Sequence, residues 1–377
     1  MQKDNVCVPC ESKNTGLIPP SIAPLDFIAG AESAIVYSVR VPDGDWKKYK
    51  PTDECQRKLT ATIYDTSSCV TFSALNSVES QIEYLLATKQ IPQDKIDLMR
   101  TLGYFDANGK VNFSDHFTAN MSGTTSAGNT LQAVWESIRK DGVLPQLGGY
   151  KVEDFNSDSE WFDRSKITDT MKTHAKKFLE IFNVQYEWAI IAPNGNAHEE
   201  FAKHLKQAPL HVATPTCASW GLPEGSIVTN CGDYKRLNHA TLNIGIDSSC
   251  YYDLDHYNPF IKKLALDYYI PYAMKGLITL KVPTVAPVIE KSHYQWTRNL
   301  SKGMRGEDVT MLQKVLIIEV PDKFKVLPTG YFGDITFNAV ISLQEKYTPK
   351  ILKIFGLSKG TGFVGVGTRT WLNLNYK

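Results

Sequence analysis

The segment that follows Cys69 constrains the fold more than any other part of the chain. Apolar residues recur after Cys69 at intervals of three and four, the spacing that places side chains on one face of a helix. They are Phe72, Leu75, Val78, Ile82 and Leu85. Ser67 or Ser68 can cap this helix, because a serine hydroxyl there accepts a hydrogen bond from an otherwise unpaired backbone N–H. We therefore predict that Cys69 lies in the first turn, where the helix dipole favours a thiolate.

A cysteine in this position has two interpretations. Most free cysteines are small buried hydrophobic residues, whereas a thiolate at a helix start is a candidate nucleophile. The residues that surround His239 favour the nucleophile. Residues 240–246 alternate between apolar and polar, which predicts a half-buried strand, and residues 250–255 alternate in phase with them after a turn at 247–249.

A hairpin centred on Asp247 places His239 opposite Asp255. Their Cβ atoms would then lie about 5 Å apart, on the face that points away from the core. A carboxylate at that distance can orient the imidazole, which is the third role in a nucleophile–base–orienter triad. The alternative is a surface ion pair at the end of a strand.

Two segments resemble the motifs of papain-like cysteine proteases. Residues 68–74 read SCVTFSA and are similar to the SCWAFSA segment around that family's nucleophile, and residues 238–240 read NHA, the motif at its histidine. Residues 208–213 resemble the strand before that histidine. The resemblance implies an α+β catalytic domain with two lobes, one helical and one of antiparallel strands. It implies catalytic roles for Cys69, His239 and Asp255, and substrate-binding roles for Gly128, Asn129 and Asn238.

The chain departs from the family pattern in several places. Val70 replaces the tryptophan after the nucleophile, and Asp255 replaces the usual asparagine. Residues 63–66 lack the glutamine that donates to the oxyanion in the family. Gln56 is the nearest upstream glutamine and could take this role only if the loop is rearranged. Asp255 and the HYNPFIKK sequence after it resemble the papain-like peptidases encoded by bacteriophages.

The C-terminal part contains an internal repeat. Residues 282–288 include two prolines and predict a semi-stiff linker. Beyond it, TGYFG at residues 329–333 recurs as TGFVG at residues 361–365, each with a threonine three residues later. This pattern resembles the small three-helix peptidoglycan-binding domain of cell-wall hydrolases, and any small helical interaction module is the alternative. We expect a catalytic domain with an N-terminal extension at residues 1–282, a linker at 283–298 and the binding domain at 299–377.

Composition excludes some classes of partner. The chain has 377 residues with 42% hydrophobic content, enough for one full-sized and one small core. A formal charge of +1 gives no electrostatic reason to expect nucleic acid. The sequence shows neither a membrane span nor the apolar region of a signal peptide. We expect a monomer, made in the cytoplasm of a host bacterium, that acts at the cell wall after release; placement in a virion is the alternative.

The seven cysteines are an odd number, so at least one has no intramolecular disulfide partner. Cys7 and Cys10 have the spacing of metal ligands or a redox pair, but no second pair accompanies them. Cys217 and Cys231 could form a disulfide. We expect no metal ion and no cofactor.

These observations predict a peptidoglycan hydrolase of the endolysin type. It would cleave amide or peptide bonds of the bacterial wall by a Cys-His-Asp mechanism and be anchored by its C-terminal domain. Two alternatives stay open: a virion-associated or exported cysteine protease that acts on proteins, and a catalytically inactive wall-binding protein.

Overall fold

The structure is a computed structural model that describes residues 16–21, 38–58, 62–146, 148–193, 197–216, 218–230, 236–281, 294–324 and 328–376. The chain divides into two compact units, Met1–Lys281 and Val282–Lys377. Most of the predicted linker lies outside the described residues. No helix within the described ranges is long and apolar enough to span a bilayer.

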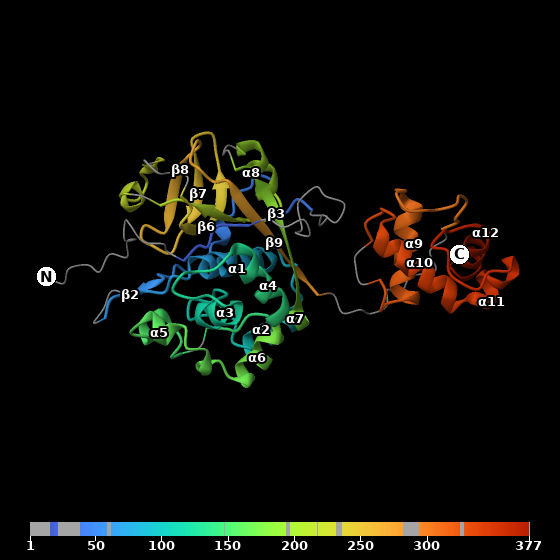
Figure 1. Cartoon of the computed structure of the whole chain (residues 1–377), viewed down its shortest axis with the longest axis horizontal. Coiled ribbons are helices and arrows are strands. Elements are labelled where there is room, and N and C mark those ends of the chain that lie inside the picture. Colours follow the sequence, from blue (N-terminus) through green and yellow to red (C-terminus); the bar gives the residue numbers. More distant parts are fainter. Residues whose placement is uncertain are drawn as a thin grey trace. The chain divides into compact units, whose positions relative to one another are not determined.

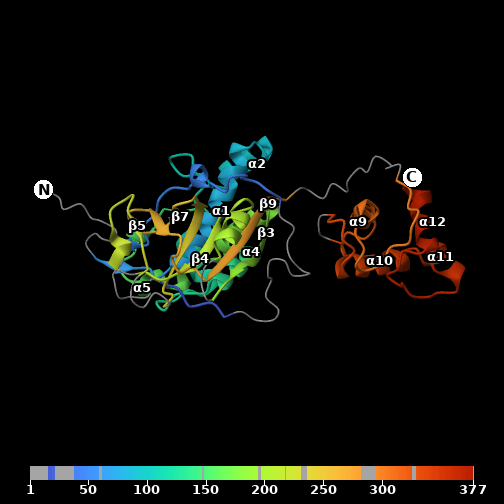
Figure 2. The same ribbon diagram turned by 90° about the horizontal axis from the view of Figure 1, so that it is seen from above.

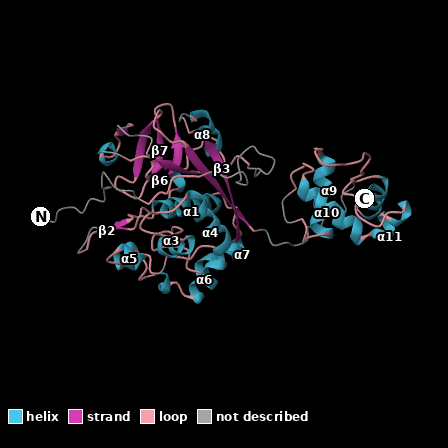
Figure 3. Cartoon of the chain, viewed as in Figure 1, coloured by secondary structure: helices cyan, strands magenta, loops and turns pink. Residues whose placement is uncertain are grey.

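The first unit has an α+β fold in which most strands lie on one side and most helices on the other (Figures 1 and 3). Its α-helices are α1 (Cys69–Ala87), α2 (Gln93–Thr101), α3 (Asp115–Ser122), α4 (Leu131–Asp141), α5 (Asp158–Trp161), α6 (Asp169–Lys176), α7 (Phe178–Ile181) and α8 (His198–Leu205). Its short 3-10 helices are η1 (Lys47–Tyr49), η2 (Val152–Asp154), η3 (Arg164–Lys166) and η4 (Ala218–Gly221).

The strands form one large sheet and one small hairpin. The large sheet has the order β3-β9-β4-β6-β7-β8-β5, and its pairs are antiparallel except for β5 with β8. Its strands are β3 (Phe182–Ile191), β4 (Leu210–Thr214), β5 (Ile227–Val228), β6 (His239–Ile246), β7 (Cys250–Leu254), β8 (Ile261–Ala265) and β9 (Tyr272–Leu280). The hairpin pairs β1 (Arg57–Lys58) with β2 (Tyr64–Asp65).

Helix α1 lies between the two layers, next to β4, β6 and β9 on one side and α3 and α4 on the other (Figure 2). The predicted helix is therefore present, but its burial is not confined to one face: every residue from Cys69 to Ile82 is buried. A close approach holds the layers together. A Cβ atom on Gly276 of β9 would lie 2.1 Å from the ring of Trp135 on α4, so only glycine lets that indole rest on the strand.

Strand β6 is also buried on both faces, since all its residues except Ile246 are inaccessible. The prediction of a half-buried strand is wrong at this point, because the polar face of β6 is buried as well, and Thr241 and Asn243 on that face donate to the Asp253 carboxylate at 2.6 Å. The strand's bounds and the turn after it agree with the prediction, and the Asp247 N–H donates to the Cys250 carbonyl at 3.1 Å.

The second unit is helical in its described residues. Its helices are α9 (Glu307–Glu319), α10 (Asp334–Lys346), α11 (Thr348–Ile351), η5 (Lys353–Phe355) and α12 (Val366–Asn375). The two copies of the sequence repeat have the same hydrogen bonds. Gln313 Oε1 accepts the N–H groups of the first Thr-Gly pair at 2.7 and 2.9 Å, and Gln344 Oε1 accepts those of the second at 2.7 and 3.1 Å. Each glutamine also donates to the threonine in the first turn of the following helix.

Candidate active site

Cys69 is the first residue of α1, as predicted, and Ser68 occupies the N-cap position. The predicted serine cap bond is not made. Ser68 Oγ instead donates to the Thr66 carbonyl at 2.8 Å and accepts from Trp161 Nε1 at 3.1 Å. This hydroxyl therefore fixes the loop before the helix rather than the helix end. The Cys69 thiol is buried, forms no disulfide and lies at the positive end of the helix dipole.

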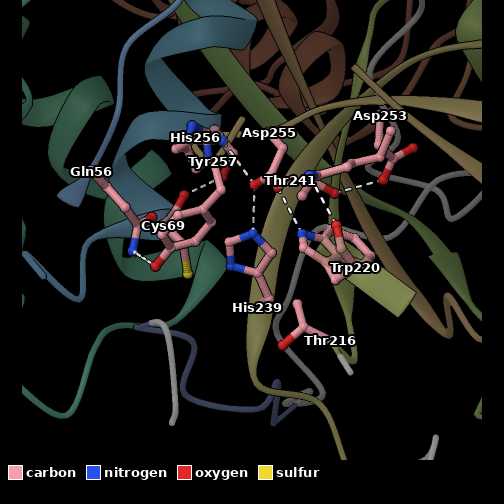
Figure 4. Close-up of polar contacts among 12 residues, drawn as sticks. Gln56, Cys69, Thr216, Trp220, His239, Thr241, Asp253, Asp255, His256 and Tyr257 are labelled. Carbon is pink, nitrogen blue, oxygen red and sulfur yellow. Dashed lines mark hydrogen bonds and ion pairs between the residues drawn. The ribbon is translucent and has the colours of Figure 1, made fainter. Parts of the chain in front are cut away.

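His239 links Cys69 to Asp255 (Figure 4). His239 Nε2 lies 2.7 Å from Asp255 Oδ1. The other ring nitrogen, Nδ1, faces Cys69, and the thiol group is hydrogen-bonded to the ring. His239 and Asp255 are 0% and 1% exposed, so their predicted place on a face away from the core is wrong. The structure thus brings together the three residues predicted to be catalytic, in the interior where the two layers meet.

The predicted hairpin register is also wrong, by two residues. Leu242 pairs with Leu254, so the position opposite His239 would be residue 257. The turn is centred nearer Ser248–Ser249, and a bulge between Asn243 and Gly245 shifts the pairing again. A shift of two residues keeps each side chain on its face. The contact survives because the chain leaves β7 after Leu254 and the Asp255 carboxylate can reach back to His239.

The charges of the three residues support one another. Burial alone disfavours the imidazolium, but the Asp255 carboxylate and Cys69 outweigh it and raise the pKa of His239 to about 10. Burial also disfavours the Asp255 carboxylate, but the charges of His239 and Lys262 hold its pKa below the usual value. His239 and Asp255 therefore form an ion pair at neutral pH.

Three further groups hold the Asp255 carboxylate, and sequence reasoning assigned them no role. Trp220 Nε1 donates to Oδ2 at 2.7 Å, and Lys262 Nζ lies 3.8 Å from the same oxygen. The His256 backbone N–H donates to Oδ1 at 2.7 Å. Lys262 is itself buried, and its Nζ donates to the Trp220 carbonyl at 3.0 Å. Trp220 comes from η4, and no local pattern in the sequence connects it to the site.

A second buried histidine supports the backbone of Cys69. Ser73 Oγ donates to the Cys69 carbonyl at 2.6 Å and lies 2.7 Å from His211 Nε2. Trp135 Nε1 donates to His211 Nδ1 at 3.1 Å. Because an indole N–H only donates, Nδ1 accepts and the His211 proton is on Nε2. Burial lowers the pKa of His211 to about 3, so this ring is neutral.

Gln56 lies beside Cys69 and Tyr257 in Figure 4 and is fully buried. The β1–β2 hairpin explains how a glutamine so far upstream reaches the site. The chain leaves at Gln56, forms the hairpin and returns at Thr66, whose N–H donates to the Gln56 carbonyl at 3.1 Å. Gln56 Nε2 donates to Tyr257 Oη at 2.7 Å and to Asp65 Oδ1 at 2.8 Å. This path brings the Gln56 side chain beside Cys69, and its role as an oxyanion donor stays a prediction.

Gly128 and Asn129 contact a segment of the chain itself. The Asn129 N–H donates to the Gly16 carbonyl at 2.9 Å, and the Ile18 N–H donates to the Asn129 carbonyl at 2.7 Å. Gly16 is in close contact with both Ser67 and Gly128. A Cβ atom on Gly16 would lie 1.9 Å from the Ser67 carbonyl oxygen, and one on Gly128 would lie 2.1 Å from the Gly16 carbonyl oxygen. Any substrate that pairs with the Asn129 backbone must therefore displace residues 16–18.

The amide of Asn238 is bonded to Thr216. Its Oδ1 accepts the Thr216 N–H at 2.7 Å, and its Nδ2 donates to Thr216 Oγ1 at 3.0 Å. Asn238 therefore joins the chain after β4 to the start of β6. Its role in binding substrate stays a prediction.

The described residues contain no group of three or more histidine, cysteine, aspartate or glutamate side chains that could hold a metal ion. Cys7, Cys10, Cys217 and Cys231 lie outside the described residues. Of the remaining cysteines, Cys55 is disulfide-bonded, and Cys69 and Cys250 are free.

No protein-family model and no curated protein sequence matches the chain. Solved structures of papain-like cysteine proteases do match. Xylellain, a cysteine protease from Xylella fastidiosa, is 14% identical over 73% of this chain and 98% of its own, with a TM-score of 0.42. The bromelain protease from Ananas comosus is 16% identical over 63% and 98%, with a TM-score of 0.38. The ragweed pollen cysteine protease in its proform is 15% identical over 67% and 69%, with a TM-score of 0.40.

Proposed function

We propose that the chain is a cysteine peptidase that cleaves amide bonds of bacterial peptidoglycan. The observation that carries the chemistry is the continuous hydrogen-bonded connection from Cys69 through His239 to Asp255. Each residue has the surroundings its role requires: a helix start for the thiolate, a carboxylate for the imidazolium, and three donors or cations around that carboxylate.

The reaction follows from this geometry. The Cys69 thiolate attacks the amide carbonyl carbon, and the carbonyl oxygen becomes an oxyanion. The Cys69 backbone N–H, at the first helical position, and Gln56 Nε2 are the proposed donors to that oxyanion. His239 gives its Nδ1 proton to the leaving amine, and the thioester forms. His239 then takes a proton from water, which attacks the thioester and releases the carboxylic acid and the thiolate.

The second unit supports peptidoglycan as the substrate class. Its repeat resembles the pattern of wall-binding domains in sequence, and both copies fold around an equivalent buried glutamine. A domain that binds the wall raises the local concentration of substrate around the catalytic unit. The near-zero net charge is consistent with a neutral or mixed-charge target rather than nucleic acid.

Incubation of the purified chain with isolated cell walls, followed by mass spectrometry of the soluble products, tests the proposal. New peptide termini would identify an endopeptidase, and freed muramyl groups with intact stem peptides would identify an amidase. Cleavage of denatured proteins without release from walls would favour a protease that acts on proteins. Absence of both activities would favour an inactive wall-binding protein.

The wall-binding role has a separate test. Residues 293–377 should sediment with isolated walls unaided, whereas residues 1–282 should cut soluble stem peptides but bind walls poorly. A C-terminal fragment that is folded by circular dichroism yet stays in the supernatant would contradict anchoring.

A further inference from the structure

Gln56 is held by two residues from distant parts of the chain, the half-buried Asp65 and the fully buried Tyr257. Asp65 is the last residue of β2, and Tyr257 lies in the loop between β7 and β8. Gln56 Nε2 lies 2.8 Å from Asp65 Oδ1 and 2.7 Å from Tyr257 Oη, and Tyr257 Oη lies 2.5 Å from Asp65 Oδ2. The three side chains therefore form a closed ring of hydrogen bonds.

The donor in each of these bonds can be assigned. A carboxylate only accepts hydrogen bonds, so the Gln56 atom that faces Asp65 must be the amide nitrogen. The same argument makes the Tyr257 hydroxyl a donor to Asp65. Its oxygen therefore accepts the second N–H of Gln56. Tyr257 is neutral in this arrangement, because burial and the Asp65 charge raise its pKa well above the usual value.

The loop just before Cys69 is hydrogen-bonded to the same Asp65 carboxylate. The Ser67 N–H donates to Asp65 Oδ1 at 2.9 Å. Ser67 has a φ of +48°, a left-handed conformation that a serine adopts at a cost. Asp65 thus fixes both Gln56 and the backbone two residues before Cys69. On the other side, the Tyr257 ring lies 5.6 Å from the His239 ring, and Figure 4 shows its hydroxyl beside Gln56 and Cys69.

We propose that Asp65 and Tyr257 are positioning residues that present the Gln56 amide to the oxyanion formed by attack of Cys69. One N–H of Gln56 is anchored on the Asp65 carboxylate. The other rests on the neutral Tyr257 hydroxyl and moves to the oxyanion as negative charge develops there. This exchange is favourable, because a hydrogen bond to a charged oxygen is about twice as strong as one to a neutral oxygen. The inference rests on the proposed function of the same site.

Two reactions of Cys69 separate this role from a purely structural one. Hydrolysis of an amide passes through an oxyanion, whereas alkylation of the thiolate by iodoacetamide does not. We would measure both rates for the full chain, with a fluorogenic peptidyl amide selected from a library on the wild-type enzyme. Removal of one oxyanion donor costs about 10²–10³ in kcat, so Gln56→Ala should lose at least 100-fold in amide hydrolysis. Asp65→Asn and Tyr257→Phe should each lose roughly 10-fold or more in kcat with KM unchanged, as partial losses of the same donor.

In these variants, the alkylation rate of Cys69 should stay within about threefold of wild type. Tyr64→Phe is the matched control: it removes a buried hydroxyl, which donates to the Val152 carbonyl at 2.7 Å, from the same hairpin. It should leave both rates unchanged. Wild-type amide hydrolysis in Asp65→Asn and Tyr257→Phe would overturn the inference, and so would an equal loss of both rates. A wild-type chain that neither hydrolyses amides nor is alkylated at Cys69 would instead refute the proposed function.

Discussion

Two buried histidines on neighbouring strands of one sheet differ in charge: one ring is an imidazolium and the other is neutral. His239 begins β6 and His211 lies in β4, and both are 0% exposed. Asp255 faces His239, and the pKa of His239 rises to about 10. His211 faces Ser73 and Trp135, which are neutral, and burial lowers its pKa to about 3. Equal burial therefore produces an acid at one position and a permanently neutral hydrogen-bonding group at the other.

The comparison shows that the partner, not the depth of burial, decides what a buried histidine can do. A neutral imidazole with a fixed tautomer is suited to hold a backbone in place, as His211 does through Ser73 and the Cys69 carbonyl. An imidazolium that can lose its proton is suited to acid–base chemistry. The predictions below test whether the two histidines differ in this way.

The largest effect should come from the reacting groups. Cys69→Ala and His239→Ala should each abolish wall lysis in a turbidity assay, because one removes the nucleophile and the other removes the proton carrier. Thermal unfolding should show that both variants still fold. More than a trace of lysis by Cys69→Ala would mean that another residue is the nucleophile.

Asp255 should contribute through both its charge and its hydrogen bond. Asp255→Ala should reduce activity by about 100-fold or more, whereas Asp255→Asn, which keeps an acceptor for the ring N–H, should retain part of it. The charge keeps the imidazolium protonated up to about pH 10. Without it the alkaline limb of the pH–rate profile should move to lower pH. Wild-type pH–rate profiles in both variants would show that Asp255 is not the third member of the catalytic triad.

Access to the buried pair should depend on residues 16–18. Gly16→Ala should expel this segment, because its Cβ atom would lie 1.9 Å from the Ser67 carbonyl oxygen. We expect Cys69 alkylation by iodoacetamide to become several-fold faster, since the helical N-terminus that favours the thiolate is then open to reagent. Gly149→Ala is the control, since Gly149 also has a positive φ but no atom within 4 Å of its Cβ position. An unchanged alkylation rate in Gly16→Ala would mean that the segment does not limit access.

The smallest effect on chemistry should come from His211. His211→Leu leaves the indole N–H of Trp135 buried without its acceptor, which costs about 1–3 kcal/mol of stability. Urea unfolding would measure this loss. The pH–rate profile should keep its shape, because His211 carries no proton in the reaction. A displaced alkaline limb in this variant would show that the two histidines are coupled.

The sequence was sufficient for the parts of the site that depend on local pattern. Helical spacing located the start of α1, and strand alternation located β6, β7 and the turn between them. The exact register was not predictable, because it depends on a bulge between Asn243 and Gly245 that no spacing shows. The error in register does not place Asp255 on the other face of the sheet, since a shift of two residues preserves the face.

The residues that contact Asp255, and the position of Gln56, could not be predicted from the sequence, because only the tertiary fold brings these residues to the site. Trp220 and Lys262 meet Asp255 only through the loops beside β5 and the pairing of β8 with β7. Gln56 was named, but its path to the site depends on the short β1–β2 hairpin. The contact of residues 16–18 with Asn129 joins segments more than a hundred residues apart, and no pattern in the sequence predicts it.

The ionisation of His239 also makes stability depend on pH. Its folded-state pKa of about 10 exceeds the ordinary value of 6.5. The charged form therefore stabilises the fold fully below pH 6.5, and this contribution is lost as the pH rises through 10. Urea unfolding between pH 6.5 and 10.5 should show a loss of stability that is smaller in His239→Gln. An identical loss in that variant would assign the pH dependence to other groups.

The charge states of the two histidines can be measured directly by NMR. In protein labelled with ¹⁵N-histidine, long-range ¹H–¹⁵N spectra distinguish an imidazolium from each neutral tautomer, and His239→Gln and His211→Gln assign the two rings. The structure predicts an imidazolium for His239 from pH 6 to 9 and a neutral ring protonated at Nε2 for His211 over the same range. A neutral His239 ring at pH 7 would contradict the ion pair on which the proposed mechanism depends.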